Sequence, residues 1–190
     1  MKPTNASKRS REYRLESEVE QLIAVVAKAH KNTLSATRNH LIILLGYRHG
    51  LHISELTSLK WNQVDFTAAR IQIKRLKNSN SGVHPLAADE CRILKKLKKH
   101  QPLKSNWIFA TKSGIPITRD GVAQALAAIA EVATLEISFY HHMLRHGCGY
   151  ELAKKGFDTR LIQEYLGHKF LQHTVLYTAL DSEKFNKLWK

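Results

Sequence analysis

The sequence has few cysteines and no long hydrophobic run, and each shortage excludes a class of protein. Among 190 residues there are two cysteines, Cys91 and Cys148, which can form one disulfide at most and no Cys-x-x-Cys pair. A disulfide-stapled scaffold and a cysteine-based zinc site are therefore not indicated, and we expect a reducing cytoplasm. Apolar runs such as residues 41–45 are far shorter than the ~20 residues that span a bilayer. Residues 1–20 show no secretion signal.

Acidic residues are also scarce relative to basic ones. Lys and Arg number 30 against 16 Asp and Glu, which gives a net charge of +14 with the 11 histidines neutral. Because basic side chains that neutralise phosphates release condensed counterions, this surplus favours a polyanionic partner, either nucleic acid or an anionic membrane surface. A merely soluble surface is the alternative. Aromatic residues make up 8% of the chain and are not clustered on strands, which disfavours a base-stacking RNA-binding platform.

Three segments carry much of the basic charge. Two of them are a polar arm over residues 1–14, which we expect to be flexible, and a predicted hairpin whose basic residues lie within residues 70–77. The third, residues 92–99, mixes lysines with apolar residues at helical spacing. That pattern is typical of an amphipathic helix with a solvated lysine face.

Hydrophobic periodicity predicts a mainly α-helical chain with one small antiparallel sheet, an α+β fold, in one domain over residues 15–190. Ser17 and Glu20 form a capping-box pattern at the start of the first helix. Alternation at residues 70–74 and 83–86 predicts two strands, residues 64–66 a third, and residues 107–109 a buried strand or apolar plug. We expect helices over residues 18–31, 35–48, 53–59, 88–100, 119–133, 141–155, 159–166, 173–180 and 183–189.

A group of histidines around one arginine, residues 140–146, is the first pattern with chemical content. On a helix, His142 shares a face with Arg145 and with His146. The His-x-x-x-His spacing could be half a zinc site, but the metalloprotease pattern requires glutamate where Met143 stands. The other interpretation is recognition of an anion, because arginine offers a planar fork of donors and histidine can donate a hydrogen bond or move a proton.

A second pattern follows downstream, where Gly167-His168 is followed nine residues later by Tyr177. Taken singly, this tyrosine would more often be a core residue. The order His-x-x-Arg, Leu-Gly-His, Tyr nevertheless resembles the tyrosine recombinase (phage-integrase-like) family. Residues 49–56, HGLHISEL, look like the family's first-arginine motif, and Arg75-Leu76-Lys77 looks like its lysine-bearing hairpin.

Within this family the chain is similar to the short recombinases that invert fimbrial promoter segments. Four stretches carry that likeness, namely residues 75–78, 142–146, 158–163 and 165–168. The resemblance implies the recombinase catalytic-domain fold without a separate N-terminal core-binding domain. It also implies a bacterial, nucleoid-associated protein that acts on double-stranded DNA with short inverted repeats as a homotetramer, with DNA-bending accessory proteins and no membrane association.

The resemblance assigns roles to individual residues. Tyr177 would attack the scissile phosphate and form a 3′-phosphotyrosyl link, which needs no cofactor and no metal. Arg145, His142 and His168 would hold the nonbridging oxygens, and Lys77 would protonate the leaving 5′-oxygen. Glu55 would support the site from behind these residues. Arg75, Lys74 and Arg48 are expected to contact DNA.

One position departs from the family pattern, because His52 stands where the motif has its first catalytic arginine. Histidine has an ordinary pKa of about 6.5 and a shorter reach than arginine. Loss of one preorganised oxyanion donor typically costs about 10² to 10³ in rate. The sequence therefore leaves two hypotheses open, an active site-specific DNA recombinase and a catalytically impaired or silent DNA-binding regulator.

Overall fold

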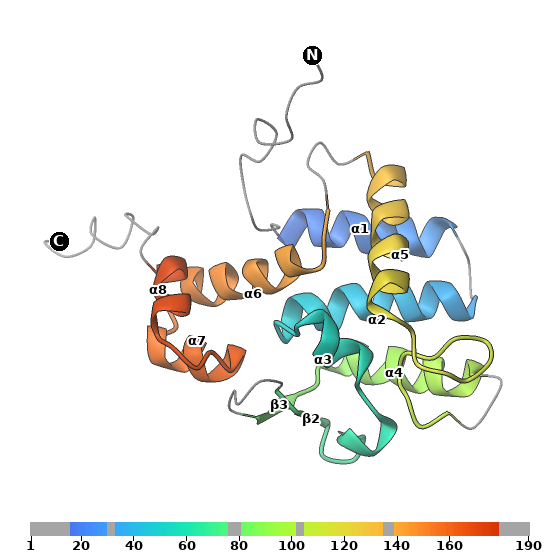
Figure 1. Cartoon of the computed structure of the whole chain (residues 1–190), viewed down its shortest axis with the longest axis horizontal. Helices are drawn as coiled ribbons and strands as arrows, with labels where there is room; N and C mark the ends of the chain where they lie inside the picture. Colours follow the sequence, from blue (N-terminus) through green and yellow to red (C-terminus); the bar gives the residue numbers. More distant parts are fainter. Residues whose placement is uncertain (1–15, 30–32, 76–80, 102–104, 135–138, 179–190) are drawn as a thin grey trace, which may run out of the picture.

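The computed structural model describes residues 16–29, 33–75, 81–101, 105–134 and 139–178. These residues form a mainly helical fold with one small sheet, so the predicted fold class is confirmed (Figure 1). In chain order the elements are α1 (Glu16–Ala29), α2 (Leu34–Arg48), α3 (Ile53–Thr57), the short 3-10 helix η2 (Trp61–Gln63), β1 (Val64–Asp65), β2 (Arg70–Ile73), β3 (Gly82–Pro85), α4 (Ala88–His100), α5 (Arg119–Val132), α6 (His142–Lys154), α7 (Thr159–Leu166) and α8 (Gln172–Thr178).

Most element boundaries lie within two residues of their predicted positions. Ser17 was predicted to cap the first helix, but α1 already begins at Glu16, so that prediction is wrong. The glutamates in the first turn favour this earlier start, because the helix N-terminus attracts negative charge. Of the two alternatives for residues 107–109, the apolar plug is confirmed, because Ile108 and Phe109 are fully buried and Trp107 forms an isolated bridge with Lys60 instead of joining the sheet. The helix predicted over residues 183–189 and the arm over residues 1–14 lie outside the described residues.

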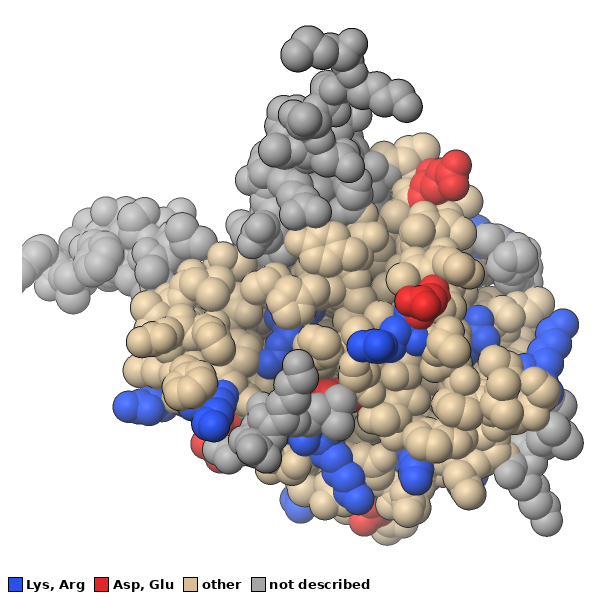
Figure 2. Space-filling view, viewed as in Figure 1, with Lys and Arg blue, Asp and Glu red and all other residues tan. Residues whose placement is uncertain are grey.

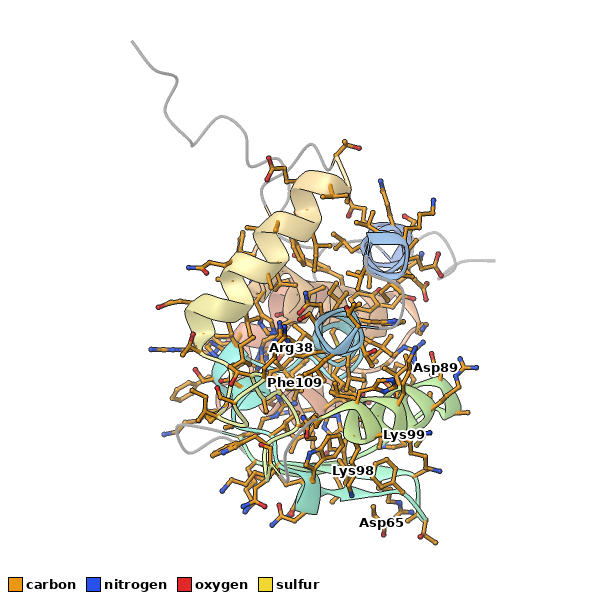
Figure 3. The ribbon with its side chains drawn as sticks, turned by 90° about the vertical axis from the view of Figure 1, so that its right-hand side faces the viewer. Arg38, Asp65, Asp89, Lys98, Lys99 and Phe109 are labelled. Carbon is orange, nitrogen blue, oxygen red and sulfur yellow. The ribbon has the colours of Figure 1, made fainter. Side chains whose placement is uncertain are left out.

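Helix α2 lies at the centre of the molecule, between α1 and α4 in Figure 1. All seven residues from Leu41 to Tyr47 are buried, so this helix is apolar on every side over two turns. It contacts α1, α4 and α6, and Phe109 fills the interior beside it, as Figure 3 shows with α2 seen end-on. The turn from His49 to His52 directly follows α2, which ends at Arg48. The buried helix therefore fixes where this turn begins.

The sheet is a three-stranded antiparallel meander in the order β1-β2-β3. In β2, exposed Arg70 and Gln72 alternate with fully buried Ile71 and Ile73. Ile71 pairs with His84 of β3, so the pleat points the His84 side chain towards the interior. The hairpin formed by β2 and β3 thereby presents one polar buried side chain to the helical part of the fold.

The C-terminal helices α6, α7 and α8 pack on one another and form a second, smaller core of Cys148, Ala153, Ile162, Leu166 and Tyr177. Asp158 caps α7 by accepting hydrogen bonds from the amides of Arg160 and Leu161. Gly167 ends α7 in a left-handed conformation with φ +70°, which places His168 directly after the turn. Among the described residues, no helix combines the length and the apolar character needed to cross a bilayer.

The contact between α2 and α6 is close and buries a histidine. A Cβ added to Gly46 would lie 3.0 Å from Leu144 Cδ1 and 3.3 Å from His141 Nε2, so glycine permits the approach. His141 is 6% exposed, and its Nε2 has no hydrogen-bond partner among the described residues. Burial, reinforced by His52, His142 and Arg145, lowers the pKa of His141 to about 3.

This buried histidine makes the stability of the fold depend on pH. Folding lowers the pKa of His141 from 6.5 to about 3, so the unfolded chain binds a proton more readily than the folded one. The contribution of His141 to stability is therefore complete above pH 6.5 and is lost as the pH decreases towards 3. We expect the free energy of unfolding to contain a loss of about 2 kcal/mol from His141 between pH 7 and pH 5. Urea unfolding at both pH values should show that His141→Leu reduces the native loss by about this amount. An unchanged loss in the variant would contradict the assignment.

Candidate active site

Arg145, predicted to bind the scissile phosphate, lies where three elements meet. It projects from α6 and donates hydrogen bonds to the carbonyl oxygen of Gly50, in the turn after α2, and to that of Leu166, 2.9 Å away at the end of α7. Its side chain is 9% exposed, and burial and the nearby Arg75 lower its pKa below the ordinary arginine value. The guanidinium is therefore fixed in position before any ligand arrives.

Glu55, which was predicted to support the site, lies next to this arginine. Its Oε2 is 2.7 Å from Arg75 Nη1 and 3.9 Å from Arg145 Nη1, so one carboxylate faces two guanidinium groups. The same oxygen accepts a hydrogen bond of 2.8 Å from the amide of His52, which closes the first turn of α3. Glu55 thus orients the cationic groups and the backbone at the first-arginine position.

Arg75 was predicted to contact DNA, and the structure contradicts this. Its side chain is only 1% exposed. It binds Glu55 and donates to the carbonyl oxygens of His49, Gly50 and Tyr165. In β2, Ile71 and Ile73 point inwards, and the next position in this alternation is Arg75. The Arg75 side chain therefore points into the protein, where its charge pairs with Glu55.

The other basic residues singled out from the sequence have different surroundings. Lys74 is exposed, next to Arg75. Arg48 is 40% exposed and forms an ion pair of 2.8 Å with Asp89 at the start of α4. Lys77 lies outside the described residues, in the connection between β2 and β3. On the face shown in Figure 2, blue Lys and Arg side chains outnumber red acidic ones and extend over its lower half.

His52 lies beside the predicted phosphate-binding residues although it is not an arginine. It is the residue before α3, it is exposed, and its ring centroid is 5.9 Å from that of His142. His142 in turn packs edge-on against His146, with 4.4 Å between centroids. Burial, with His146, Arg145 and His52 as further causes, lowers the pKa of His142 to about 4. The imidazole of His142 is therefore neutral at pH 7.

Tyr177, the predicted nucleophile, is buried in the same cluster. It is 3% exposed, and its hydroxyl lies 3.0 Å from His146 Nδ1. Its ring stacks on that of His168, with 6.1 Å between centroids. A Cβ on Gly149 would lie 2.5 Å from the Tyr177 ring, so α6 accommodates the tyrosine only because this position is glycine. Burial raises the pKa of Tyr177 to about 12, so the hydroxyl is protonated.

His168 is held by α8. Its Nδ1 lies 2.9 Å from the Oγ1 of Thr174, a fully buried residue one helical turn before Tyr177. Burial, with Arg145 as the next cause, lowers the pKa of His168 to about 3, so this imidazole is also neutral at pH 7. The structure thus brings Tyr177, His168, Arg145, His142 and His52 to one region, formed by α6, α8 and the turns before α3 and after α7.

His146 is a site residue that the sequence analysis did not single out. The signal was present, because His146 lies one turn after His142 on α6. From the sequence, the spacing of these two histidines indicates half of a metal site, and nothing in it links His146 to Tyr177. Among the described residues, no group of three or more His, Cys, Asp or Glu side chains is placed to hold a metal ion. The partner of His146 is instead the Tyr177 hydroxyl.

Comparisons with known proteins give a family match and similar sequences. Residues 13–184 match the Phage integrase family. The type 1 fimbriae regulatory protein FimE of Escherichia coli K12 is 40% identical over 164 residues, which cover 82% of this chain and 81% of that protein. FimB of the same strain is 37% identical over 188 residues, 97% of this chain and 92% of that protein.

Solved structures show the same fold. The XerH recombinase in a post-cleavage complex with palindromic difH substrate superposes with a TM-score of 0.79 at 24% identity. The match covers 97% of this chain but 54% of that one, so the chain spans about half the length of this structural neighbour. With the family match and the fimbrial relatives, these findings place the chain in the phage integrase family, as a tyrosine-type site-specific recombinase similar to the fimbrial regulatory proteins.

Proposed function

We propose that this chain inverts a DNA segment that carries a fimbrial promoter, by cutting and rejoining DNA through a 3′-phosphotyrosyl intermediate. The observation that carries the proposal is the position of Tyr177, whose ring stacks on His168 and whose hydroxyl lies 3.0 Å from His146, on the helix that carries Arg145. Similarity to FimE and FimB supports the fimbrial assignment. The partner is double-stranded DNA with short inverted repeats, as the DNA complexes of structural neighbours suggest.

In the proposed reaction, the hydroxyl oxygen of Tyr177 forms a bond to the scissile phosphorus and loses its proton to solvent. The bond from phosphorus to the 5′-oxygen breaks, and Lys77 donates the proton that this oxygen takes up. Arg145, His142 and His168 donate hydrogen bonds to the nonbridging oxygens, where negative charge accumulates. The phosphotyrosyl bond stores the energy of the original phosphodiester, so the 5′-hydroxyl of a partner strand can reverse the step without ATP.

The resting position of Tyr177 implies a movement before cleavage. At 3% exposure the hydroxyl cannot reach a phosphate on bound DNA, so α8 shifts and the contact with His146 breaks. Neutral His142 and His168 are single donors in the resting site, since their pKa values are lowered to about 4 and 3. An arriving phosphate favours their protonated forms, because a negative charge raises the pKa of a neighbouring histidine.

We further propose that four copies assemble on two inverted repeats, in the bacterial cytoplasm and on the nucleoid, with the help of DNA-bending proteins. Exposed Lys74 is placed to contact a phosphate directly. Arg48 contacts DNA only if it exchanges Asp89 for a phosphate. An active recombinase is the function we favour. His52, which places no guanidinium at the first-arginine position, keeps a silent DNA-binding regulator as the second candidate.

The covalent intermediate provides the decisive test. We expect the native chain to become attached to a nicked suicide duplex that carries the inverted repeat nearest its own gene, as a slowly forming band on a denaturing gel. His52→Arg should raise the rate about 10² to 10³-fold, because it supplies the missing preorganised donor. Tyr177→Phe should abolish attachment.

The two candidate functions give different results in this assay. An adduct with the native chain supports the recombinase. An adduct with His52→Arg and none with the native chain supports the silent regulator. If Tyr177→Phe still becomes attached, Tyr177 is not the nucleophile.

Salt dependence tests the assignment of DNA as the partner. If roughly 6 to 10 of the basic side chains contact phosphates, the affinity for this duplex should fall about 10³ to 10⁵-fold between 50 and 200 mM salt. Fluorescence anisotropy of a labelled duplex measures this slope. Lys74→Ala should reduce the magnitude of the slope of log affinity against log salt concentration by about one, because one phosphate contact is lost. A flat salt response would contradict DNA binding through the phosphates.

A further inference from the structure

Buried contacts hold the β2–β3 hairpin on both sides of the connection that contains Lys77. Arg75 is the last described residue before this connection and Ser81 the first after it. The amide of Arg75 donates a hydrogen bond of 3.1 Å to Ser81 Oγ, which brings the two ends together just beyond the paired strands β2 and β3. Two buried side chains, Arg75 and His84, hold these ends against the helices.

Arg75 holds the first end. Its guanidinium reaches the Tyr165 carbonyl at 2.7 Å on α7, as well as Glu55 at 2.7 Å on α3. A Cβ on Gly167 would lie 2.9 Å from Arg75 Cγ, so glycine after α7 makes room for this side chain. These contacts join the hairpin to α3 and α7, which also position Arg145. Because Glu55 faces both arginines, a change in Arg75 would disturb Arg145 as well.

His84 holds the second end through contacts that avoid Arg145. It is 4% exposed, and its ring packs on that of Tyr165 with 4.1 Å between centroids. Its Nδ1 lies 3.2 Å from Nδ1 of His49, and Nε2 of His49 lies 3.1 Å from Oε1 of Glu90 at the start of α4. The proposed mechanism uses none of these buried polar groups.

These contacts form one buried chain of hydrogen bonds. Nδ1 of His84 shares one hydrogen bond with Nδ1 of His49, and Nε2 of His49 shares another with the Glu90 carboxyl group. Burial, with His49 and Arg75 as further causes, lowers the pKa of His84 to about 3, so its imidazole is neutral at pH 7. Each of the three side chains therefore satisfies a buried polar atom of the next one.

We propose that His84, acting through His49 and Glu90, is a positioning residue that fixes the hairpin relative to the arginine site and so places the general acid at the leaving 5′-oxygen. The inference rests on the proposed function, in which Lys77 is that acid. It predicts that loss of the His84 hydrogen bond impairs protonation of the leaving group while the phosphate-binding residues remain intact.

A matched pair of variants separates hydrogen bonding from packing. His84→Phe keeps a ring against Tyr165 but cannot form a hydrogen bond, whereas His84→Asn keeps a hydrogen-bonding group near the place of Nδ1 but loses the ring. Each is tested on two nicked duplexes, one with the normal 5′-oxygen and one with sulfur at that bridging position. With sulfur, the bond from phosphorus to the 5′-sulfur breaks and a thiolate leaves without a proton, because thiols have a pKa of about 8.5.

We expect His84→Phe to form the covalent adduct about tenfold or more slowly on the oxygen substrate and within about threefold of the native rate on the sulfur substrate. His84→Asn should stay within about threefold of the native chain on both. Val83→Ala, on the exposed face of the same strand, is the control and should match the native chain on both. A defect of His84→Phe that is equal on the two substrates would overturn the proposal.

Two further measurements keep this result independent of the proposed function. If Lys77→Ala is not rescued by sulfur, the general-acid assignment fails, and the positioning claim is then decided by hydrogen exchange. His84→Phe should exchange the amides of residues 71–75 and 82–84 faster than the native chain, with those of α6 unchanged. Equal exchange at the hairpin in the two proteins would overturn the proposal even if neither cleaves DNA.

Discussion

The site depends on one buried carboxylate between two guanidinium groups. Glu55 lies 2.7 Å from Arg75 and 3.9 Å from Arg145, and all three side chains are less than a tenth exposed. One negative charge cannot balance two positive charges, so this part of the interior carries a surplus of about one unit. Charges withdrawn from water are costly unless they are paired. A phosphate brought next to Arg145 would supply the missing negative charge, so the fold itself favours an anion there.

Gly50 makes this arrangement geometrically possible. Its carbonyl oxygen accepts hydrogen bonds from both Arg75 and Arg145, and its φ of +56° lies in the left-handed region. A Cβ at this position would collide with Leu166, so the turn after α2 can approach α7 only with glycine. The positions of the hairpin, the turn and α7 are therefore fixed by the same few atoms, and a change in one of these elements reaches the other two.

Sequence reasoning located the helices and the sheet because each has a local signature. It grouped His142, Arg145, His168 and Tyr177 only through the resemblance of their order and spacing to a family motif. The inward turn of Arg75 cannot be read from the sequence, because it depends on a carboxylate twenty residues away and on the carbonyl of Tyr165, which lies 90 residues away. The prediction that Ser17 caps the first helix was wrong for a local reason. The acidic residues beside Ser17 favour a helix that begins one residue earlier.

The resting site combines a protonated tyrosine, the proposed nucleophile, with neutral histidines, and both protonation states follow from burial. Packing of Tyr177 against Gly149 and His168 raises the tyrosine pKa to about 12, and the same lack of water lowers the pKa of His168 to about 3. In this state the tyrosine is protonated and the histidines do not add to the repulsion between Arg75 and Arg145. Insertion of a phosphate would raise the pKa values of the neighbouring histidines and so favour their charged forms. A chain with His52 depends on this protonation of histidines more than a chain with arginine at position 52 would, because arginine is charged before the phosphate arrives.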